Sequence, residues 1–148
     1  MTKMLLLRPE VSGGFGPNTI VRKPNPEHLE GTYQQVENLE YVFEGWLGDE
    51  LITSHPVFIV TQSLAEALLN SNLSGFRLDD VFVYKSEQFD DFHPDIILPK
   101  FSRLVLLGRI KIENDECYHS WSETDMNQSL EGELVVSRKA YNVIQSHS

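Results

Sequence analysis

The stretch that most constrains the fold is Pro56–Asn70, which predicts a buried strand, a hydroxyl cap and an amphipathic helix. Residues 57–60 are β-branched or aromatic, a composition typical of a strand packed on both faces. Thr61 or Ser63 can end this strand, and Ser63 with Glu66 has the spacing of a capping box. Apolar residues then follow at three- and four-residue spacing on one face of the predicted helix: Leu64, Ala67 and Leu68.

The same pattern returns near the end of the sequence, over residues 134–144. An apolar triplet at Leu134–Val136 is followed by Ser137 and then by a helical stripe that reaches Ile144. When the two stretches are aligned, Thr61 coincides with Ser137, 76 residues later. Two copies are too few for a stacked-repeat architecture, which needs at least about three. They are either two related elements of one domain or a coincidence of a common succession.

Length and pattern together predict one α+β domain over residues 1–148, a mixed β-sheet with two or three helices. A strand and a Gly/Pro-rich segment are expected within residues 1–36, and the main body within residues 37–148. The expected strands cover residues 4–8, 39–44, 57–60, 76–85, 101–112 and 134–136, with a bulge at Gly108. A helical turn is expected at residues 49–52. The expected loops cover residues 11–26 and 86–99, and residues 113–129 are a loop or a weak helix.

The charge of the chain restricts its partners. Its formal net charge is -10 over 148 residues. Nonspecific binding to nucleic acid requires Lys and Arg to neutralise phosphates, so this class is excluded and a basic partner is favoured.

Cysteine content and hydropathy restrict the compartment. The single cysteine, Cys117, excludes an internal disulfide and a multi-cysteine zinc site. The apolar run at residues 4–7 is too short for a signal peptide, and no stretch approaches the roughly 20 apolar residues of a membrane helix. We expect a cytoplasmic protein that needs neither a metal nor a cofactor. The sequence leaves open whether the native chain continues past Ser148.

Three segments without Lys or Arg contain 16 of the 22 carboxylates. These segments are residues 37–50, 87–95 and 113–133. If they fold onto one face, its field attracts a cationic partner and raises the association rate. Otherwise they are solvated surface loops.

Short motifs that could carry chemistry are weak. Asp90–Asp95 mixes carboxylates with His93 but lacks the spacing and the glycine of a calcium loop. Cys117 and His119 are too close in sequence to form a nucleophilic pair with a third orienting group. Trp121 lies in an acidic stretch, where it is either core or an exposed anchor for a partner. The residues predicted to bind a partner are Asp49, Glu50, Asp90, Asp91, Asp115, Glu116, Trp121, Glu123 and Asp125.

Several stretches resemble small bacterial immunity proteins of polymorphic-toxin and contact-dependent inhibition systems. The similarity covers residues 39–144 and is carried by Tyr41–Leu51, Phe58–Thr61, Leu73–Phe76, Leu98–Phe101 and Leu134–Ser137. The resemblance implies a protein that binds and neutralises a cognate toxin without catalysis, and it supplies no catalytic residue to carry over.

Three functions therefore remain in view. The first is an immunity protein whose acidic loops bind a basic toxin domain. The second is a small enzyme with a site assembled from Asp49, Glu50, His93 and His119. The third is an accessory or regulatory module that binds another protein.

Overall fold

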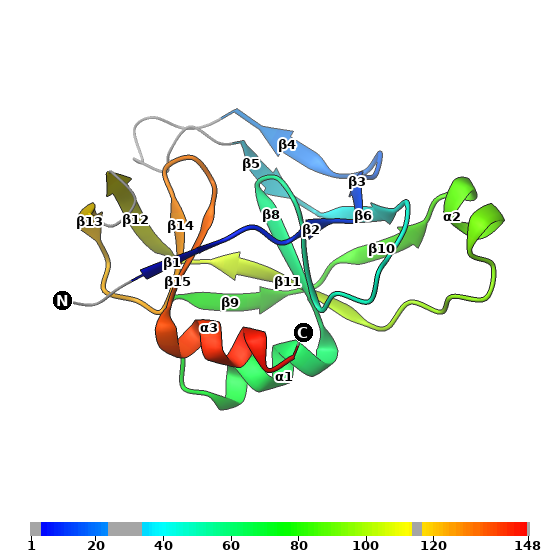
Figure 1. Ribbon diagram of the computed structural model, residues 1–148. Helices are drawn as coiled ribbons and strands as arrows, with labels where there is room; N and C mark the ends of the chain where they lie inside the picture. Colours follow the sequence, from blue (N-terminus) through cyan, green and yellow to red (C-terminus); the bar gives the residue numbers. More distant parts are fainter. Residues whose placement is uncertain (1–3, 24–33, 114–116, 148) are drawn as a thin grey trace.

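The computed structural model describes residues 4–23, 34–113 and 117–147 and has the expected α+β fold (Figure 1). One five-stranded sheet has the order β1-β15-β14-β12-β13. Its strands are β1 (Met4–Leu7), β15 (Leu134–Ser137), β14 (Met126–Ser129), β12 (Gly108–Glu113) and β13 (Cys117–Trp121). A second five-stranded sheet has the order β2-β7-β8-β11-β9. Its strands are β2 (Glu10–Val11), β7 (Leu51–Ser54), β8 (Val57–Thr61), β11 (Phe101–Leu106) and β9 (Phe76–Asp79).

Two smaller sheets and the helices complete the described part of the chain. A three-stranded sheet consists of β10 (Phe82–Lys85), β6 (Glu40–Phe43) and β3 (Gly13–Phe15), and a two-stranded sheet of β4 (Ile20–Arg22) and β5 (Gln35–Glu37). The helices are α1 (Gln62–Asn70), α2 (Glu87–Phe92) and α3 (Arg138–Gln145). Helices α1 and α3 pack against each other on one side of the large sheets (Figure 1).

The two large sheets are joined at two corners, because β1 runs on into β2 and β11 runs on into β12. Gly108 stands at the second corner. A Cβ atom there would collide with Thr124 Oγ1 and with the carbonyl oxygen of Met126, so only glycine fits. The prediction of one continuous strand over residues 101–112 with a bulge is therefore wrong, since the chain changes sheets at this glycine.

Both predicted strand–cap–helix units are formed, and they occupy equivalent places. In each unit an antiparallel hairpin leads directly into a helix: β7, β8 and α1 in one, β14, β15 and α3 in the other. The second strand of each hairpin pairs antiparallel with a corner strand, β8 with β11 and β15 with β1. The first strand pairs in parallel with the other half of a corner strand, β7 with β2 and β14 with β12. The sequence likeness of the two stretches thus corresponds to a structural repeat within one domain.

The helix caps follow the predicted hydroxyls, with one correction. Ser137 Oγ accepts a hydrogen bond from the Ala140 amide at 3.1 Å, and Thr61 Oγ1 accepts one from the Leu64 amide at 3.3 Å. Helix α1 begins at Gln62, immediately after Thr61, so the predicted capping box of Ser63 and Glu66 is wrong. A residue inside the first turn has helical backbone angles and cannot serve as the cap.

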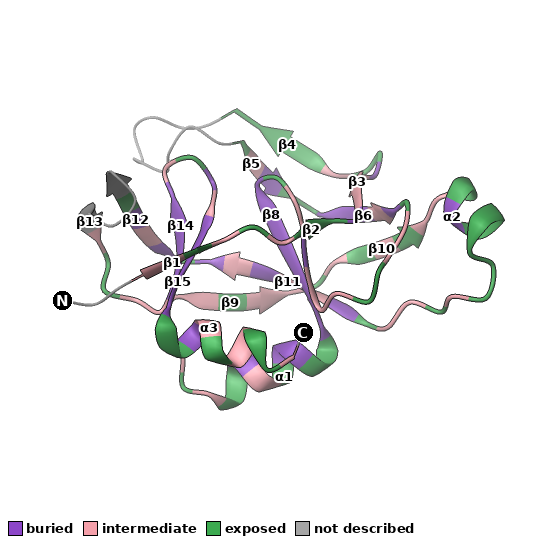
Figure 2. Ribbon diagram, viewed as in Figure 1, coloured by how far each residue is buried: buried purple, intermediate pink, exposed green. Residues whose placement is uncertain are grey.

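The core lies on both faces of β8, as its composition predicts (Figure 2). Phe58 and Val60 pack toward α1 and α3 with the apolar residues of the second unit. Val57 and Ile59 pack toward the three-stranded sheet, beside Tyr41 and neighbouring aromatic residues. Strand β8 therefore contributes residues to both apolar clusters and separates them.

Several segments expected to be loops contain short elements. Residues 11–26 contribute to β2, β3 and β4, and residues 86–99 contain α2. The helical turn expected at residues 49–52 is not formed, because β7 begins at Leu51. Residues 76–85 form two strands, β9 and β10, in different sheets, and residues 117–129 contribute β13 and β14. These strands are short, and β2, β3 and β10 pair with segments far away in the chain, so the local sequence carries little of the signal that defines them.

Leu68 and Leu69 provide a direct test of the α1 assignment. Leu68 is fully buried, whereas Leu69 is 61% exposed. We expect Leu68→Ala to lower the free energy of unfolding by about 2–5 kcal/mol, because it leaves a cavity in the core. Leu69→Ala, the matched control, should change it by less than about 0.5 kcal/mol. Urea unfolding of both variants checks the assignment, and equal losses would contradict it.

Candidate functional site

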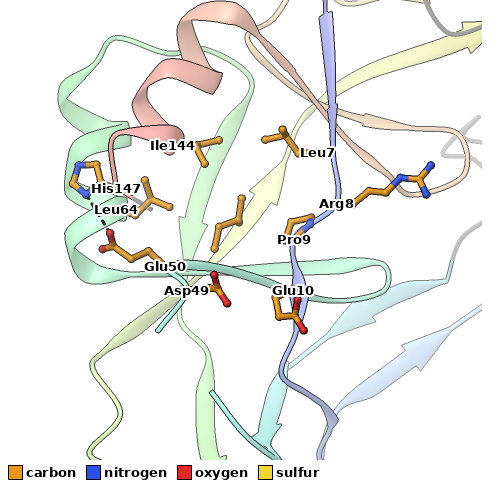
Figure 3. A pocket seen from close by; sticks show the side chains of 10 residues that line it. Leu7, Arg8, Pro9, Glu10, Asp49, Glu50, Leu64, Ile144 and His147 are labelled. Atoms are coloured by element: carbon orange, nitrogen blue, oxygen red, sulfur yellow. Dashed lines mark ion pairs between the residues drawn. The ribbon is translucent and has the colours of Figure 1, made fainter. Parts of the chain in front are cut away.

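A cleft opens where β1 turns into β2, beside the start of β7 and the end of α3 (Figure 3). It has a volume of about 310 Å³. We call it the acidic cleft, and its lining residues are Leu7, Arg8, Pro9, Glu10, Asp49, Glu50, Leu51, Leu64, Ile144 and His147.

The acidic cleft has an apolar wall and an acidic wall. The apolar wall consists of Leu7, Leu51, Leu64 and Ile144, and the acidic wall of Glu10, Asp49 and Glu50 (Figure 3). The side chain of Arg8 is 81% exposed and extends away from the carboxylates, and its Nη2 lies 3.8 Å from Glu133 Oε2. Arg8 therefore does not neutralise the acidic wall.

The three carboxylates differ in their hydrogen bonds and ion pairs with the rest of the domain. Glu50 Oε1 accepts a hydrogen bond from Thr61 Oγ1 at 2.8 Å, and Glu50 Oε2 lies 3.5 Å from His147 Nδ1. Asp49 holds Trp46 through its backbone, because its carbonyl oxygen accepts the indole N–H at 2.9 Å. The side-chain carboxylates of Glu10 and Asp49 form neither an ion pair nor a hydrogen bond with the residues that the structure describes. These two are free to receive a cation.

A second hollow adjoins the acidic cleft and shares Glu10 with it. It has a volume of about 350 Å³, and we call it the Trp46 hollow. Its lining residues are Glu10, Val11, Ser12, Gly13, Glu44, Gly45, Trp46, Leu47 and His93. Two of them are large apolar residues in contact with solvent, since Val11 is 61% and Leu47 84% exposed. Apolar and acidic side chains thus lie side by side along this surface.

The predicted partner-binding residues do not gather on one face. Asp49 and Glu50 meet in the acidic cleft, whereas Asp90 and Asp91 are exposed on α2. Figure 1 shows α2 and β13 at opposite ends of the molecule, so the interpretation of the three acidic segments as one face is wrong. Asp115 and Glu116 lie outside the described residues.

The remaining predicted residues near β13 are placed as follows. Glu123 is exposed, and Trp121 is half-buried, with its indole N–H donating to the carbonyl oxygen of Thr124 at 3.2 Å. Asp125 belongs to the fold, because Oδ1 accepts from Ser137 Oγ at 2.8 Å and Oδ2 accepts from the Ser74 amide at 3.0 Å. These bonds argue against the prediction of Asp125 as a free carboxylate for a partner.

Sequence reasoning missed Glu10, the residue that the two hollows share. Its only local signal is its position after Pro9, at the end of a predicted strand. The enzyme hypothesis drew on Asp49, Glu50, His93 and His119, and the structure separates them. His93 lines the Trp46 hollow rather than the acidic cleft, and the side chain of His119 is not among those described. Within the described ranges, no group of three or more His, Cys, Asp or Glu side chains is arranged to hold a metal ion.

The carboxyl groups with shifted pKa values lie away from the cleft. Glu40, in β6, is buried beside Asn18, whose side chain donates to its carboxylate at 3.0 Å. This bond, with those from the Asn18 amide and Tyr84, lowers the pKa of Glu40 despite the opposing effect of burial. These groups are explained by the fold and do not mark the cleft as a catalytic centre.

Comparison of the sequence with models of protein families gave no match, and comparison with curated proteins found no relative. The resemblance to immunity proteins therefore stays a prediction. In the described part of the chain, every helix is too short or too polar to cross a membrane.

Asp125 predicts how stability depends on pH. Burial acts to raise its pKa, but hydrogen bonds from Ser74 and Ser137 outweigh burial, and the pKa is lowered. A lowered pKa stabilises the folded state above the unfolded-state value of about 3.9, and this stabilisation is lost as the pH falls through the folded-state pKa.

We therefore expect Asp125→Asn to reduce the free energy of unfolding most at neutral pH, with the deficit shrinking as the pH falls below about 4. Glu123→Gln, which removes a nearby exposed carboxylate, is the control and should differ little from the parent at every pH. Urea unfolding between pH 7 and acid measures both differences. A deficit for Asp125→Asn that stays constant with pH would contradict the assignment.

Proposed function

We propose that this protein binds a basic protein partner through the acidic cleft and the Trp46 hollow, and that the partner is a bacterial toxin which it neutralises. The observation that carries the proposal is an apolar wall beside the carboxylates of Glu10 and Asp49, which have no ion pair or hydrogen bond with any described residue. A lysine or arginine side chain has the complementary form, because its aliphatic stem packs on apolar surface while its charged end seeks a carboxylate.

The surface beside the cleft has the composition of an interface. Val11 and Leu47 are large, apolar and exposed, and the carboxylates of Glu10 and Glu44 lie next to them. Protein interfaces combine an apolar centre with a polar rim, and the fully buried centre carries most of the binding energy. The two hollows together supply both parts.

The net charge supports the choice of partner. A formal charge of -10 attracts a cationic protein over a distance of about one Debye length, roughly 8–10 Å in physiological salt. The toxin is proposed from the sequence resemblance given above, which implies binding without catalysis. The proposal requires no metal, no cofactor and no catalytic residue of this chain.

The experiment uses the toxin domain encoded beside the gene for this protein, measured in surface-based binding kinetics at low and at physiological salt. We expect a stable complex whose association rate falls as the salt concentration rises, together with loss of the toxin's activity in the complex. The absence of any complex with the adjacent toxin would overturn the proposal.

Charge reversal locates the interface. We expect Glu10→Lys combined with Asp49→Lys to slow association by about tenfold or more at low salt, because electrostatic steering changes association rates by 10–1,000-fold. Neither side chain forms a hydrogen bond with the part of the chain that the structure describes, so the melting temperature should change little.

Glu123→Lys is the control for a single reversal and is compared with Glu10→Lys alone, since Glu123 is exposed between β13 and β14 and lines neither hollow. It should leave the association rate nearly unchanged. If Glu123→Lys slows association while the double variant does not, the partner binds near β13 and the acidic cleft is not the interface.

A further inference from the structure

A small polar cleft lies between β5, the start of β8, the end of β11 and β14, separate from the acidic cleft. It has a volume of about 80 Å³. We call it the arginine cleft, after Arg103 and Arg109, and its other polar side chains are Gln34, Gln35 and Gln128. In a chain with a net charge of -10, no described residue lining this cleft is acidic.

Both guanidinium groups are held in place by backbone oxygens. Arg103 Nη1 donates to the carbonyl oxygen of Val36 at 2.8 Å. Arg109 Nη1 donates to the carbonyl oxygens of Leu106 at 2.8 Å and Gly108 at 3.0 Å. These bonds use one nitrogen of each side chain, and a guanidinium carries five N–H donors in a rigid fork. Each arginine therefore retains donors for a further acceptor.

Neither arginine has an ion-pair partner among the described residues. Asp79 lies opposite Arg103 in the strand register, but its carboxylate pairs with Arg77 at 3.1 Å. Burial lowers the pKa of Arg103. The charge of Asp79 acts to raise this pKa, and the charge of Arg77 acts to lower it further. The carboxylate of Asp79 is shared with Arg77 and offsets only part of the cost of burying the Arg103 cation, so a bound anion would offset the remainder.

Gln35 supplies an independent indication. Its side-chain Nε2 is buried and has no hydrogen-bond partner in the described structure, and Gln35 lines the arginine cleft. Buried polar atoms are nearly always hydrogen-bonded, so a donor left without a partner beside an open polar cleft indicates a missing acceptor. Gln128, by contrast, is satisfied, since its Nε2 donates to the carbonyl oxygens of Pro56 and Gly132.

We propose that the arginine cleft binds one small oxyanion, a phosphate or a carboxylate group, with Arg103, Arg109 and the Gln35 amide as donors. Arginine favours such groups because its planar fork matches the spacing of their oxygens. The volume of about 80 Å³ exceeds the roughly 30 Å³ of one water molecule. It lies well below the roughly 300–1,000 Å³ of sites for drug-sized ligands, so the cleft takes a single group. This site is independent of the acidic cleft and of the proposed partner.

The test measures inorganic phosphate binding to the full chain by ³¹P NMR line broadening, and by the thermal midpoint at constant ionic strength with chloride as the replacement anion. We expect saturable binding of phosphate and a midpoint that rises above its value in chloride. Acetate, followed by the line width of its ¹H methyl signal and by the same thermal midpoint, distinguishes a carboxylate site from a phosphate site. Phosphate also stabilises proteins nonspecifically, but that effect does not saturate and does not depend on one side chain.

Arg109→Gln should weaken phosphate binding by about tenfold or more, the effect of losing a charge-assisted hydrogen bond. Arg138→Gln removes the same charge from an exposed position on α3 and should leave binding unchanged. If Arg109→Gln does not fold, Gln35→Leu still decides. If the Gln35 amide binds the anion, Gln35→Leu weakens phosphate binding. If the amide is only an unsatisfied buried group, Gln35→Leu raises the thermal midpoint and leaves phosphate binding unchanged.

Phosphate broadening that occurs to the same extent in the parent and in Arg109→Gln would overturn the proposal, as would equal midpoints in phosphate, acetate and chloride. Binding of acetate but not of phosphate would retain the site and assign it to a carboxylate group.

Discussion

The arrangement of the domain depends on a carboxylate that accepts a hydrogen bond from the hydroxyl capping each core helix. Glu50 accepts from Thr61 Oγ1, and Asp125 accepts from Ser137 Oγ, both at 2.8 Å. In both units the backbone repeats the link, because the amide of the capping residue donates to the carbonyl oxygen of the acidic residue at 2.9 Å. Each acidic residue precedes the first strand of its hairpin, so these bonds fix the helix start, the hairpin register and the approach of the chain together.

The same linkage explains why one unit carries an open cleft and the other does not. Around Asp125, the segment after α1 fills the equivalent space, because the amide and hydroxyl of Ser74 donate to Oδ2. Around Glu50, the described residues after α3 contribute one contact, from His147 Nδ1 at 3.5 Å. The space left beside Glu50 is the acidic cleft, with the neighbouring carboxylates of Glu10 and Asp49 facing it (Figure 3). A structural repeat thus leaves an open cleft where its two halves differ.

The parts of the fold that the sequence predicts are those with dense local signals. The buried β8 and β15, their capping hydroxyls and the helices that follow could be predicted because composition and spacing agree over about ten residues. Short strands such as β3 could not, since their pairing partners lie far away in the chain. In the site, Asp49 and Glu50 could be predicted because they lie in an acidic segment. Glu10 could not, because it comes close to them only through the fold of the chain between β1 and β2. Asp125 shows the converse, because its charge suggests a surface role and its hydrogen bonds give it a structural one.

The central claim is that a basic partner docks on the acidic cleft and the Trp46 hollow. Hydrogen–deuterium exchange of the chain, alone and with the proposed toxin partner, tests this docking, because amides covered by a partner exchange more slowly. We expect slower exchange on binding in residues 7–13 and 44–51, the segments that line the two hollows, and no change in residues 117–123. Slower exchange confined to residues 117–123 or to α2, with residues 7–13 and 44–51 unaffected, would contradict it.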